Sequence, residues 1–192
     1  MNYKLTISYD GSNYSGWQIQ SSEKTIQGEI QDSIREIFNN ESINLIGSGR
    51  TDSGVHANNQ VANFNTNTNI SLEKVKDAIN SKIDNDIYIK SCEIVDDDFH
   101  SRFSAIKRNY IYKISTSYNV FNRNSVWCVR WKLDKKKLNQ CANFIKEQID
   151  FRNFCKGVSQ KQNNMCRIFI SEWSFDKNSF IFRIEANRFL HH

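Results

Sequence analysis

YKLTISY, residues 3–9, alternates apolar and polar side chains without a break. Alternation at every second residue is typical of a β-strand with one buried face. The polar segment DGSN, residues 10–13, then predicts a turn. After it, Thr25 predicts the N-terminal cap of a helix, and apolar residues follow at helical spacing: Ile26, Ile30, Ile34, Ile37 and Phe38. The chain therefore begins by pairing a half-buried strand with an amphipathic helix.

The rest of the chain continues to mix strands with helices. Similar patterns predict strands at residues 43–46, 60–65, 87–95, 108–115, 167–175 and 180–186. Ser71 and Asp134 predict the caps of two more helices, whose inward residues are Leu72, Val75, Ala78 and Ile79 in one and Leu138, Cys141, Ala142 and Ile145 in the other. Residues 176–178 predict a hairpin turn. Because strands and helices do not alternate regularly, we expect an α+β fold with largely antiparallel pairing.

Composition limits the class of protein. A chain of 192 residues with 39% hydrophobic side chains is long enough for one large or two small packed domains. No apolar run approaches the ~18 residues of a membrane span, and residues 1–4 lack the apolar stretch of a signal peptide. We therefore expect a cytoplasmic protein without a membrane partner. The five cysteines are scattered and odd in number, which predicts reduced, buried thiols rather than disulfides or a zinc site: Cys92, Cys128, Cys141, Cys155 and Cys166.

The net charge of +5 conceals two halves of opposite sign. Residues 1–98 hold 8 Lys and Arg against 15 Asp and Glu, whereas residues 99–192 hold 18 against 6. We place a domain boundary at this change, between an acidic half (residues 1–98) and a basic half (residues 99–192). A half this basic favours a polyanionic partner, either RNA or DNA, although a solvated basic face without a partner would look the same.

The stretch most suggestive of chemistry is GRTDSGVHA, residues 49–57. Glycines on both sides of Arg50, Thr51 and Asp52 permit tight backbone geometry close to a ligand. An ionised aspartate there can act as a nucleophile or as a general base. From the residues alone, a turn with a side-chain cap is the more common structure for such a stretch. A metal site formed by Asp52 and His56 is the weaker interpretation, because no cluster of ligands surrounds them.

A second segment, FHSRFSAIKRNYIY at residues 99–112, interleaves aromatic and cationic side chains. Aromatic rings can stack on exposed bases while cations such as Arg102, Lys107 and Arg108 neutralise phosphates. A core-facing strand with a cationic outer face is the alternative. Trp17, with Gln18 after it, likewise fits either packing or a platform for a base.

These motifs, taken in order, resemble the TruA family of tRNA pseudouridine synthases over essentially all 192 residues. The matching segments are residues 9–20 (the opening motif), 25–28 (the start of the first helix), 49–60 (the catalytic motif), 99–112 (the segment with Tyr110) and 186–190 (the approach to a late active-site strand).

The resemblance implies roles for individual residues. Asp52 matches the catalytic aspartate, the nucleophile or base that starts cleavage of the uracil C1′–N1 bond. Arg50 matches the arginine that helps to displace and hold the flipped-out nucleotide. Tyr110 matches the tyrosine that stacks on the target uracil and can assist removal of the C5 proton. No cofactor and no metal take part in this reaction.

The resemblance also implies a fold, a substrate and an assembly. The expected fold has a mixed, largely antiparallel central sheet flanked by helices, built from two ferredoxin-like halves. The expected activity is isomerisation of uridines in the anticodon stem-loop of tRNA by a homodimer whose tRNA spans both subunits, with no role for DNA. The family pattern continues beyond His192 into a Met-Val-Arg segment whose Arg pairs with the catalytic Asp. We therefore expect the C-terminal half to be truncated relative to the family, and the chain alone to be impaired or inactive.

Two other functions fit parts of the sequence. A non-catalytic RNA-binding module would use the basic half and keep Asp52 only as a turn residue. A metal-dependent nuclease would use Asp52, His56 and the acidic run at residues 96–98, although only four histidines are present. We favour the synthase because its motifs occur in order along the whole chain.

Overall fold

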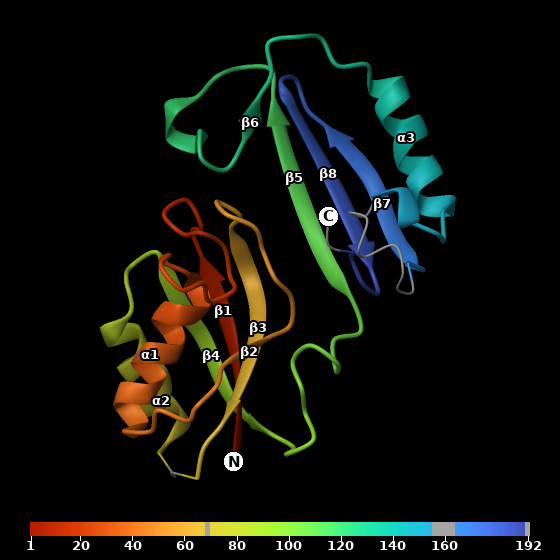
Figure 1. Cartoon of the computed structure of the whole chain (residues 1–192). Helices are drawn as coiled ribbons and strands as arrows, with labels where there is room; N and C mark the ends of the chain where they lie inside the picture. The colour runs from red at the N-terminus through yellow and green to blue at the C-terminus, as the bar shows by residue number, and fades with distance from the viewer. Residues whose placement is uncertain (68–69, 155–163, 191–192) are drawn as a thin grey trace. The chain divides into compact units, whose positions relative to one another are not determined.

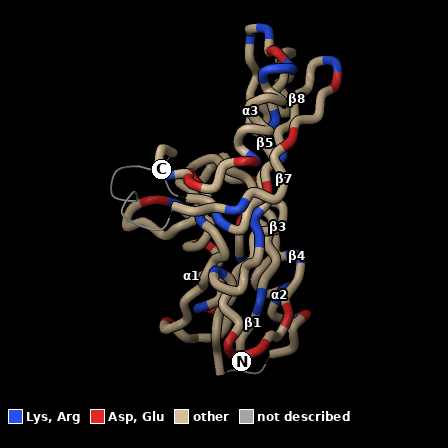
Figure 2. Tube along the Cα trace, turned by 90° about the vertical axis from the view of Figure 1, so that its right-hand side faces the viewer, with Lys and Arg blue, Asp and Glu red and all other residues tan. Residues whose placement is uncertain are grey.

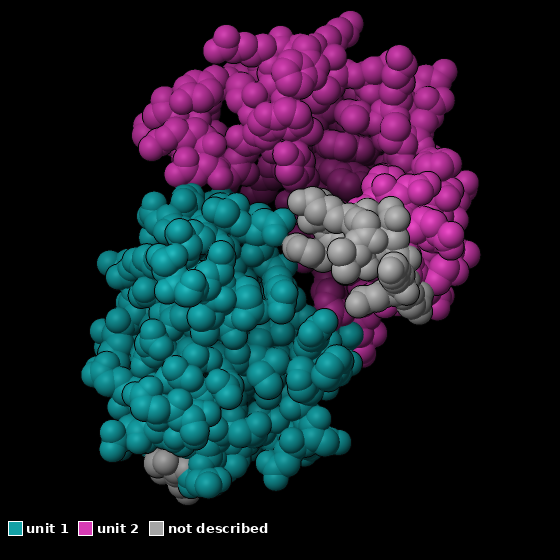
Figure 3. All heavy atoms as spheres, viewed as in Figure 1, with its two compact units in different colours: residues 1–105 teal, residues 106–192 magenta. Residues whose placement is uncertain are grey.

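A computed structural model describes residues 1–67, 70–154 and 164–190. It divides into two compact units, unit 1 (residues 1–105) and unit 2 (residues 106–192), which Figure 3 distinguishes by colour. Figure 1 labels the main elements. In chain order they are β1 (Asn2–Tyr9), α1 (Ile26–Phe38), β2 (Ile46–Gly47), β3 (Ala57–Asn65), α2 (Leu72–Lys82), β4 (Ile87–Val95), β5 (Arg108–Ser115), the short helix Val120–Asn122, β6 (Trp127–Cys128), α3 (Lys135–Glu147), the short helix Arg152–Phe154, β7 (Ile168–Phe175) and β8 (Ser179–Ala186).

Unit 1 is a ferredoxin-like β-α-β-β-α-β fold. Its four strands lie in the order β2-β3-β1-β4, and every neighbouring pair is antiparallel. β1 is therefore an inner strand, hydrogen-bonded to β3 along one edge and to β4 along the other. Its end at Tyr9 lies opposite Ala57, where β3 begins. This register brings the segment after β1 close to the segment before β3.

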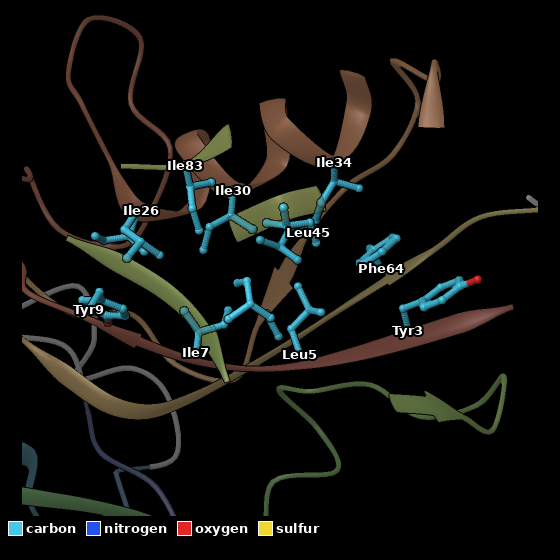
Figure 4. Packing of buried hydrophobic residues seen from close by; sticks show 14 of the residues in the cluster. Tyr3, Leu5, Ile7, Tyr9, Ile26, Ile30, Ile34, Leu45, Phe64 and Ile83 are labelled. Atoms are coloured by element: carbon cyan, nitrogen blue, oxygen red, sulfur yellow. The ribbon is translucent and has the colours of Figure 1, made fainter. Parts of the chain in front are cut away.

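The core of unit 1 follows from the alternation in β1. Tyr3, Leu5 and Ile7 are completely buried, and Figure 4 shows Leu5 and Ile7 pointing toward the side of Ile30 and Ile34 of α1, with Tyr3 beside Phe64. Fully burying one side chain of this size contributes roughly 1.5–3 kcal/mol, so this face supplies much of the driving force for folding. The predicted helix is confirmed, and the hydroxyl of its cap, Thr25, accepts a hydrogen bond from the Gly28 N–H at 3.3 Å.

The strand predicted at residues 43–46 is wrong for most of its length, because only Ile46–Gly47 pair with β3. Side chains of α1 bond the backbone that a strand would have used. Leu45 donates its N–H to Gln31 Oε1 at 3.0 Å, and its carbonyl accepts from Gln27 Nε2 at 2.7 Å. The carbonyl of Ile43 accepts from Arg35 Nε at 2.9 Å. Apolar residues here are buried against the helix without entering the sheet.

Buried amides attach residues 96–101 to the β-sheet of unit 1. Asn63 donates to Asn2 Oδ1 at 3.0 Å and accepts the Ser101 N–H at 2.9 Å. Asn2 donates to the carbonyls of Asp96 and Phe99 at 3.0 and 2.8 Å. These bonds keep the segment with unit 1, so the division falls after Ala105 and not at the change of charge after Asp98.

Unit 2 has a second sheet in the order β6-β5-β8-β7, in which only the short β5–β6 pair is parallel. The succession β5, α3, β7, β8, with sheet order β7-β8-β5, repeats the arrangement of β1, α1, β2 and β3 in unit 1. The mainly antiparallel sheet expected from the sequence is thus present as two four-stranded sheets, one in each unit. The predicted hairpin is confirmed, with Asp176 N–H bonded to the Ser179 carbonyl at 2.9 Å.

Among the residues that the structure describes, unit 2 buries fewer side chains than unit 1. Its core cluster contains Ile114, Val129 and Phe180, and only Ala142 of α3 is buried. Cys141 is exposed, so its predicted burial is wrong: it lies on the outer side of a helix that covers mainly β7. Cys166 is buried, Cys92 and Cys128 are partly buried, and Cys155 lies outside the described residues. In the part of the chain that the structure describes, no helix is both long and apolar enough to cross a membrane.

Replacing Asn63 with Ala is expected to destabilise the protein strongly. The change leaves the side-chain oxygen of buried Asn2 and the backbone N–H of Ser101 without this hydrogen-bond partner, which costs about 1–3 kcal/mol for each. Asn65→Ala, an exposed change on the same strand, is the matched control and should stay within about 0.5 kcal/mol of wild type. Urea unfolding measures both free energies, and equal values for the two variants would contradict the role given to Asn63.

The Glu185→Gln variant is expected to show how one buried carboxylate links stability to pH. Glu185 is 6% exposed, and the ammonium group of Lys107, at 3.0 Å, together with the Asn109 amide holds the pKa of its carboxyl below the usual value. A lowered folded-state pKa stabilises the protein above the unfolded-state pKa, and this contribution is lost as pH falls through the folded-state value. Wild type should therefore melt at a higher temperature than Glu185→Gln near neutrality, and the difference should shrink as pH falls below the usual pKa of a glutamate and through the lowered folded-state value. A difference independent of pH would refute this.

Candidate active site

Arg50 and Asp52 lie on the loop between β2 and β3, which we call the Asp52 loop (residues 48–56). Both side chains are exposed, and among the described residues neither makes a hydrogen bond or an ion pair. A carboxylate and a guanidinium displayed in this way are available to a ligand. The backbone on either side of Arg50 and Asp52 fixes their position, because it is bonded to other segments of unit 1.

Gln60 holds the first part of the Asp52 loop. This residue of β3 is 9% exposed, donates from Nε2 to the Gly49 carbonyl at 2.7 Å, and accepts the Ser48 hydroxyl at 2.8 Å. The Ser48 N–H also bonds the Val61 carbonyl at 2.8 Å. The chain is therefore secured immediately before Arg50.

The centre of the Asp52 loop is held at Thr51 by the segment that follows β1, which we call the first loop (residues 10–17). The Thr51 carbonyl accepts the Trp17 N–H at 3.0 Å, and its hydroxyl shares a hydrogen bond with the Tyr9 hydroxyl at 2.8 Å. Gly16 makes this approach possible, since its φ is +92° and a Cβ atom there would lie 2.5 Å from the Thr51 carbonyl oxygen. Trp17 is 1% exposed, so it packs in the core and does not serve as a platform for a base.

The loop beyond Asp52 is held by Tyr14. The Tyr14 carbonyl accepts the Ser53 hydroxyl at 3.2 Å and the Gly54 N–H at 3.3 Å. The Val55 N–H bonds back to the Asp52 carbonyl at 3.2 Å and closes a tight turn. Residues on both sides of Asp52 are thus bonded to the first loop, while the Asp52 side chain is exposed.

His56 lies next to Asp10 of the first loop. The distance from Asp10 Oδ1 to His56 Nδ1 is 3.0 Å, and the two side chains remain partly exposed. The structure describes no group of three or more His, Cys, Asp and Glu side chains placed to hold a metal ion. The metal site considered for Asp52 with His56 therefore lacks a third ligand within the described ranges.

The predicted substrate-binding residues fall into both units. Arg102 belongs to unit 1, where its guanidinium lies over the Phe103 ring with 5.7 Å to the centroid. The backbone N–H of Arg102 donates to His100 Nδ1 at 3.2 Å. The Phe103 side chain is 76% exposed, so this aromatic and cationic group is on the surface. Figure 2 shows residues of both charges in each unit.

Lys107, Arg108 and Tyr110 lie at the start of unit 2. Lys107 is bonded to Glu185, and Arg108 Nη1 donates to the Asn187 carbonyl at 2.9 Å. Tyr110 is 36% exposed and its ring meets the edge of Phe189 with 4.8 Å between centroids. Arg50 and Asp52 are thus neighbours within unit 1, and these three residues are neighbours within unit 2.

The contacts that hold the loop are not evident in the sequence. There Thr51 and Ser53 are parts of a motif and His56 is a candidate metal ligand, and nothing indicates that Glu185 is the partner of Lys107. The largely polar stretch from residue 48 to 56 was the available signal. The partners themselves come from a segment about 40 residues earlier in the chain.

Comparison with known proteins identifies the family. A family model described as tRNA pseudouridine synthase matches residues 5–104, which include the whole Asp52 loop. The tRNA pseudouridine synthase A of Dictyoglomus thermophilum is 41% identical, and the match covers 99% of this chain and 78% of that relative. Those of Bacillus pumilus and Caldicellulosiruptor saccharolyticus are 36% and 40% identical, each again over 78% of the relative and over 100% and 99% of this chain.

The α+β fold with its two mainly antiparallel sheets agrees with this match over nearly the whole chain. The chain belongs to the tRNA pseudouridine synthase A (TruA) family.

Proposed function

We propose that this chain isomerises uridine to pseudouridine in the anticodon stem-loop of tRNA, with Asp52 as its catalytic group. One observation carries the proposal: in a member of this family, a loop bonded on both sides presents an exposed carboxylate that makes no hydrogen bond or ion pair with the described residues. Such a carboxylate is available to a nucleoside placed against the loop. Its neighbours hold the backbone and leave the side chain open.

The reaction rearranges one nucleoside. The C1′–N1 bond breaks, the uracil turns, and a C1′–C5 bond forms. C5 loses its proton and N1 gains one, so the product is an isomer and no electron is exchanged with another molecule. The balance therefore calls for no redox cofactor. Asp52 starts the bond cleavage, as nucleophile or as base, and both roles need an ionised carboxylate.

Arg50 is assigned to the step before the chemistry. A uridine in a stem has to leave the base stack before a side chain can reach C1′, which costs a few kcal/mol. Arg50 would help to displace the nucleotide and to hold it against the carboxylate, a role supported by its exposed guanidinium two residues before Asp52 on the same loop.

The substrate contacts proposed for the remaining site residues divide by chemistry. Tyr110 offers a partly exposed aromatic ring for stacking on the target uracil. Arg102, Lys107 and Arg108 offer cations for phosphates. The excess of Lys and Arg in residues 99–192 supports tRNA as the polyanion bound. The family resemblance supports a cytoplasmic homodimer whose tRNA spans both subunits.

Asp52→Asn is expected to abolish conversion while leaving tRNA binding within about twofold of wild type. The amide keeps the shape of the side chain but is a poor nucleophile and base. Single-turnover assays with the chain in excess over tRNA, read out as tritium released from C5, measure even slow conversion. Electrophoretic mobility shift measures the binding.

Two outcomes would count against this assignment. Equal conversion by wild type and Asp52→Asn would remove Asp52 from the chemistry. Binding without conversion by either protein would contradict activity of this chain, and it would fit both the RNA-binding module and the impaired synthase expected from the sequence.

Lys107→Ala is expected to weaken tRNA binding and to reduce the slope of log affinity against log salt by about one, as for the loss of one phosphate contact. Lys82→Ala, which removes a cation paired with Glu36 on the helical side of unit 1, is the matched control and should leave the slope unchanged. Filter binding over a range of salt concentrations measures both. An unchanged slope for Lys107→Ala would mean that Lys107 pairs with Glu185 and contacts no phosphate.

A further inference from the structure

Asp10 is the first residue of the first loop, and it contacts His56, the last residue of the Asp52 loop. Asp10 follows β1 and His56 precedes β3, next to the register pair of Tyr9 and Ala57. His56 Nδ1 lies 3.0 Å from Asp10 Oδ1 and 3.2 Å from the Gly11 nitrogen. Two groups of the first loop thus converge on one nitrogen of the imidazole.

The proton on His56 can be assigned from chemistry. Nδ1 either accepts a hydrogen bond from the Gly11 N–H or donates one to Asp10, and it cannot do both at once. Hydrogen bonds from Ser12, and the neighbouring His56, hold the pKa of the Asp10 carboxyl below its usual value, so this carboxyl is ionised near neutrality. An ionised carboxylate 3.0 Å from a bare Nδ1 would repel it. We therefore assign the proton to Nδ1, which donates to Asp10.

This hydrogen bond lies at one end of the turn that carries Asp52. Val55 bonds back to Asp52, and the next residue is His56. The backbone of Val55 also packs tightly on Gly11, where a Cβ atom would lie only 2.2 Å from the Val55 carbonyl oxygen. Thr51 holds the other end of the turn through Tyr9 and Trp17.

The position of Asp52 depends on these two ends. Its own side chain makes no hydrogen bond or ion pair with any described residue, so only its backbone can place the carboxylate. A shift of about 1 Å at a catalytic group can cost about 100-fold in rate. A contact that fixes the backbone four residues away is therefore able to control the rate without touching the substrate.

We propose that Asp10 and His56 are positioning residues for Asp52: their hydrogen bond fixes the far end of the turn and so sets where the carboxylate meets the target uridine. This inference rests on the proposed function. It assigns to the two side chains a role in geometry, and no role as a metal site or as a proton carrier in the reaction.

The first experiment measures the geometry without using activity. His56→Ala is expected to speed amide hydrogen exchange at Gly54 and Val55 by about tenfold or more, while the amides of β1 and β3 keep wild-type protection. His56→Asn should restore protection, because its side-chain nitrogen lies close to the position of Nδ1 and can donate to Asp10. Asn13→Ala, which removes a bond to Asp86 from the same loop, is the control and should leave both amides unchanged. Equal exchange at Gly54 and Val55 in His56→Ala and wild type would overturn the proposal.

The second experiment measures the consequence for the reaction. In single-turnover assays at saturating tRNA, His56→Ala should lower the rate by about 100-fold with the Kd for tRNA within about twofold. His56→Asn should recover most of the rate. Adding Asp10→Ala to His56→Ala should change the rate little, since the two residues act through one bond.

The outcomes separate the possibilities. An unchanged rate in His56→Ala, or a His56→Asn variant as slow as His56→Ala, overturns the positioning role, the latter because the imidazole itself would then be required. A loss of tRNA affinity as large as the loss of rate also overturns it. If wild type converts no uridine while the exchange differences are present, the contact between the loops stands and the proposed function is what fails.

Discussion

The backbone pairing of β1 with β3 and β4 is the constraint on which unit 1 depends. One face of β1 provides completely buried side chains for the core beneath α1, and its two edges align the neighbouring strands. The same register places Tyr9 opposite Ala57, so the chain leaving β1 meets the chain entering β3. The core and the candidate active site are therefore consequences of one set of strand pairings. A shift of one residue would turn the buried face outward and separate the two loops as well.

The candidate active site combines a rigid backbone with open side chains. Hydrogen bonds reach the Asp52 loop at Gly49, Thr51, Ser53, Gly54 and His56, whereas Arg50 and Asp52 remain exposed between them. This division has a physical reason. Backbone groups of a loop have to be satisfied to stay ordered, but a side chain that meets a substrate has to remain free until the substrate arrives. The closely packed glycines of the first loop allow the two loops to approach within hydrogen-bonding distance.

The elements with strong periodicity were predictable, and the exceptions have local causes. β1, α1, β3, β4 and the β7–β8 hairpin follow patterns that a sequence displays directly. The strand expected at residues 43–46 did not form because Gln27, Gln31 and Arg35 of α1 bond its backbone, a choice that apolar alternation does not reveal. The burial expected for Cys141 failed because α3 covers β7 with a narrow face. The boundary between the two units follows Ala105 and not the change of charge after Asp98, because buried amides tie residues 96–101 to unit 1.

The sequence by itself determined the fold class, the order of most elements and the family-like loop with Arg50 and Asp52, since these depend on patterns within short stretches of chain. Only the tertiary structure decided which residues hold that loop. Tyr9, Asp10, Tyr14, Gly16 and Trp17 contact residues about 40 positions later, and no local periodicity reports a contact between distant segments. It likewise decided that Trp17 packs in the core, that Lys107 is paired with Glu185, and that His56 meets Asp10. Local sequence sets what each side chain can do, and strand register sets which side chains meet.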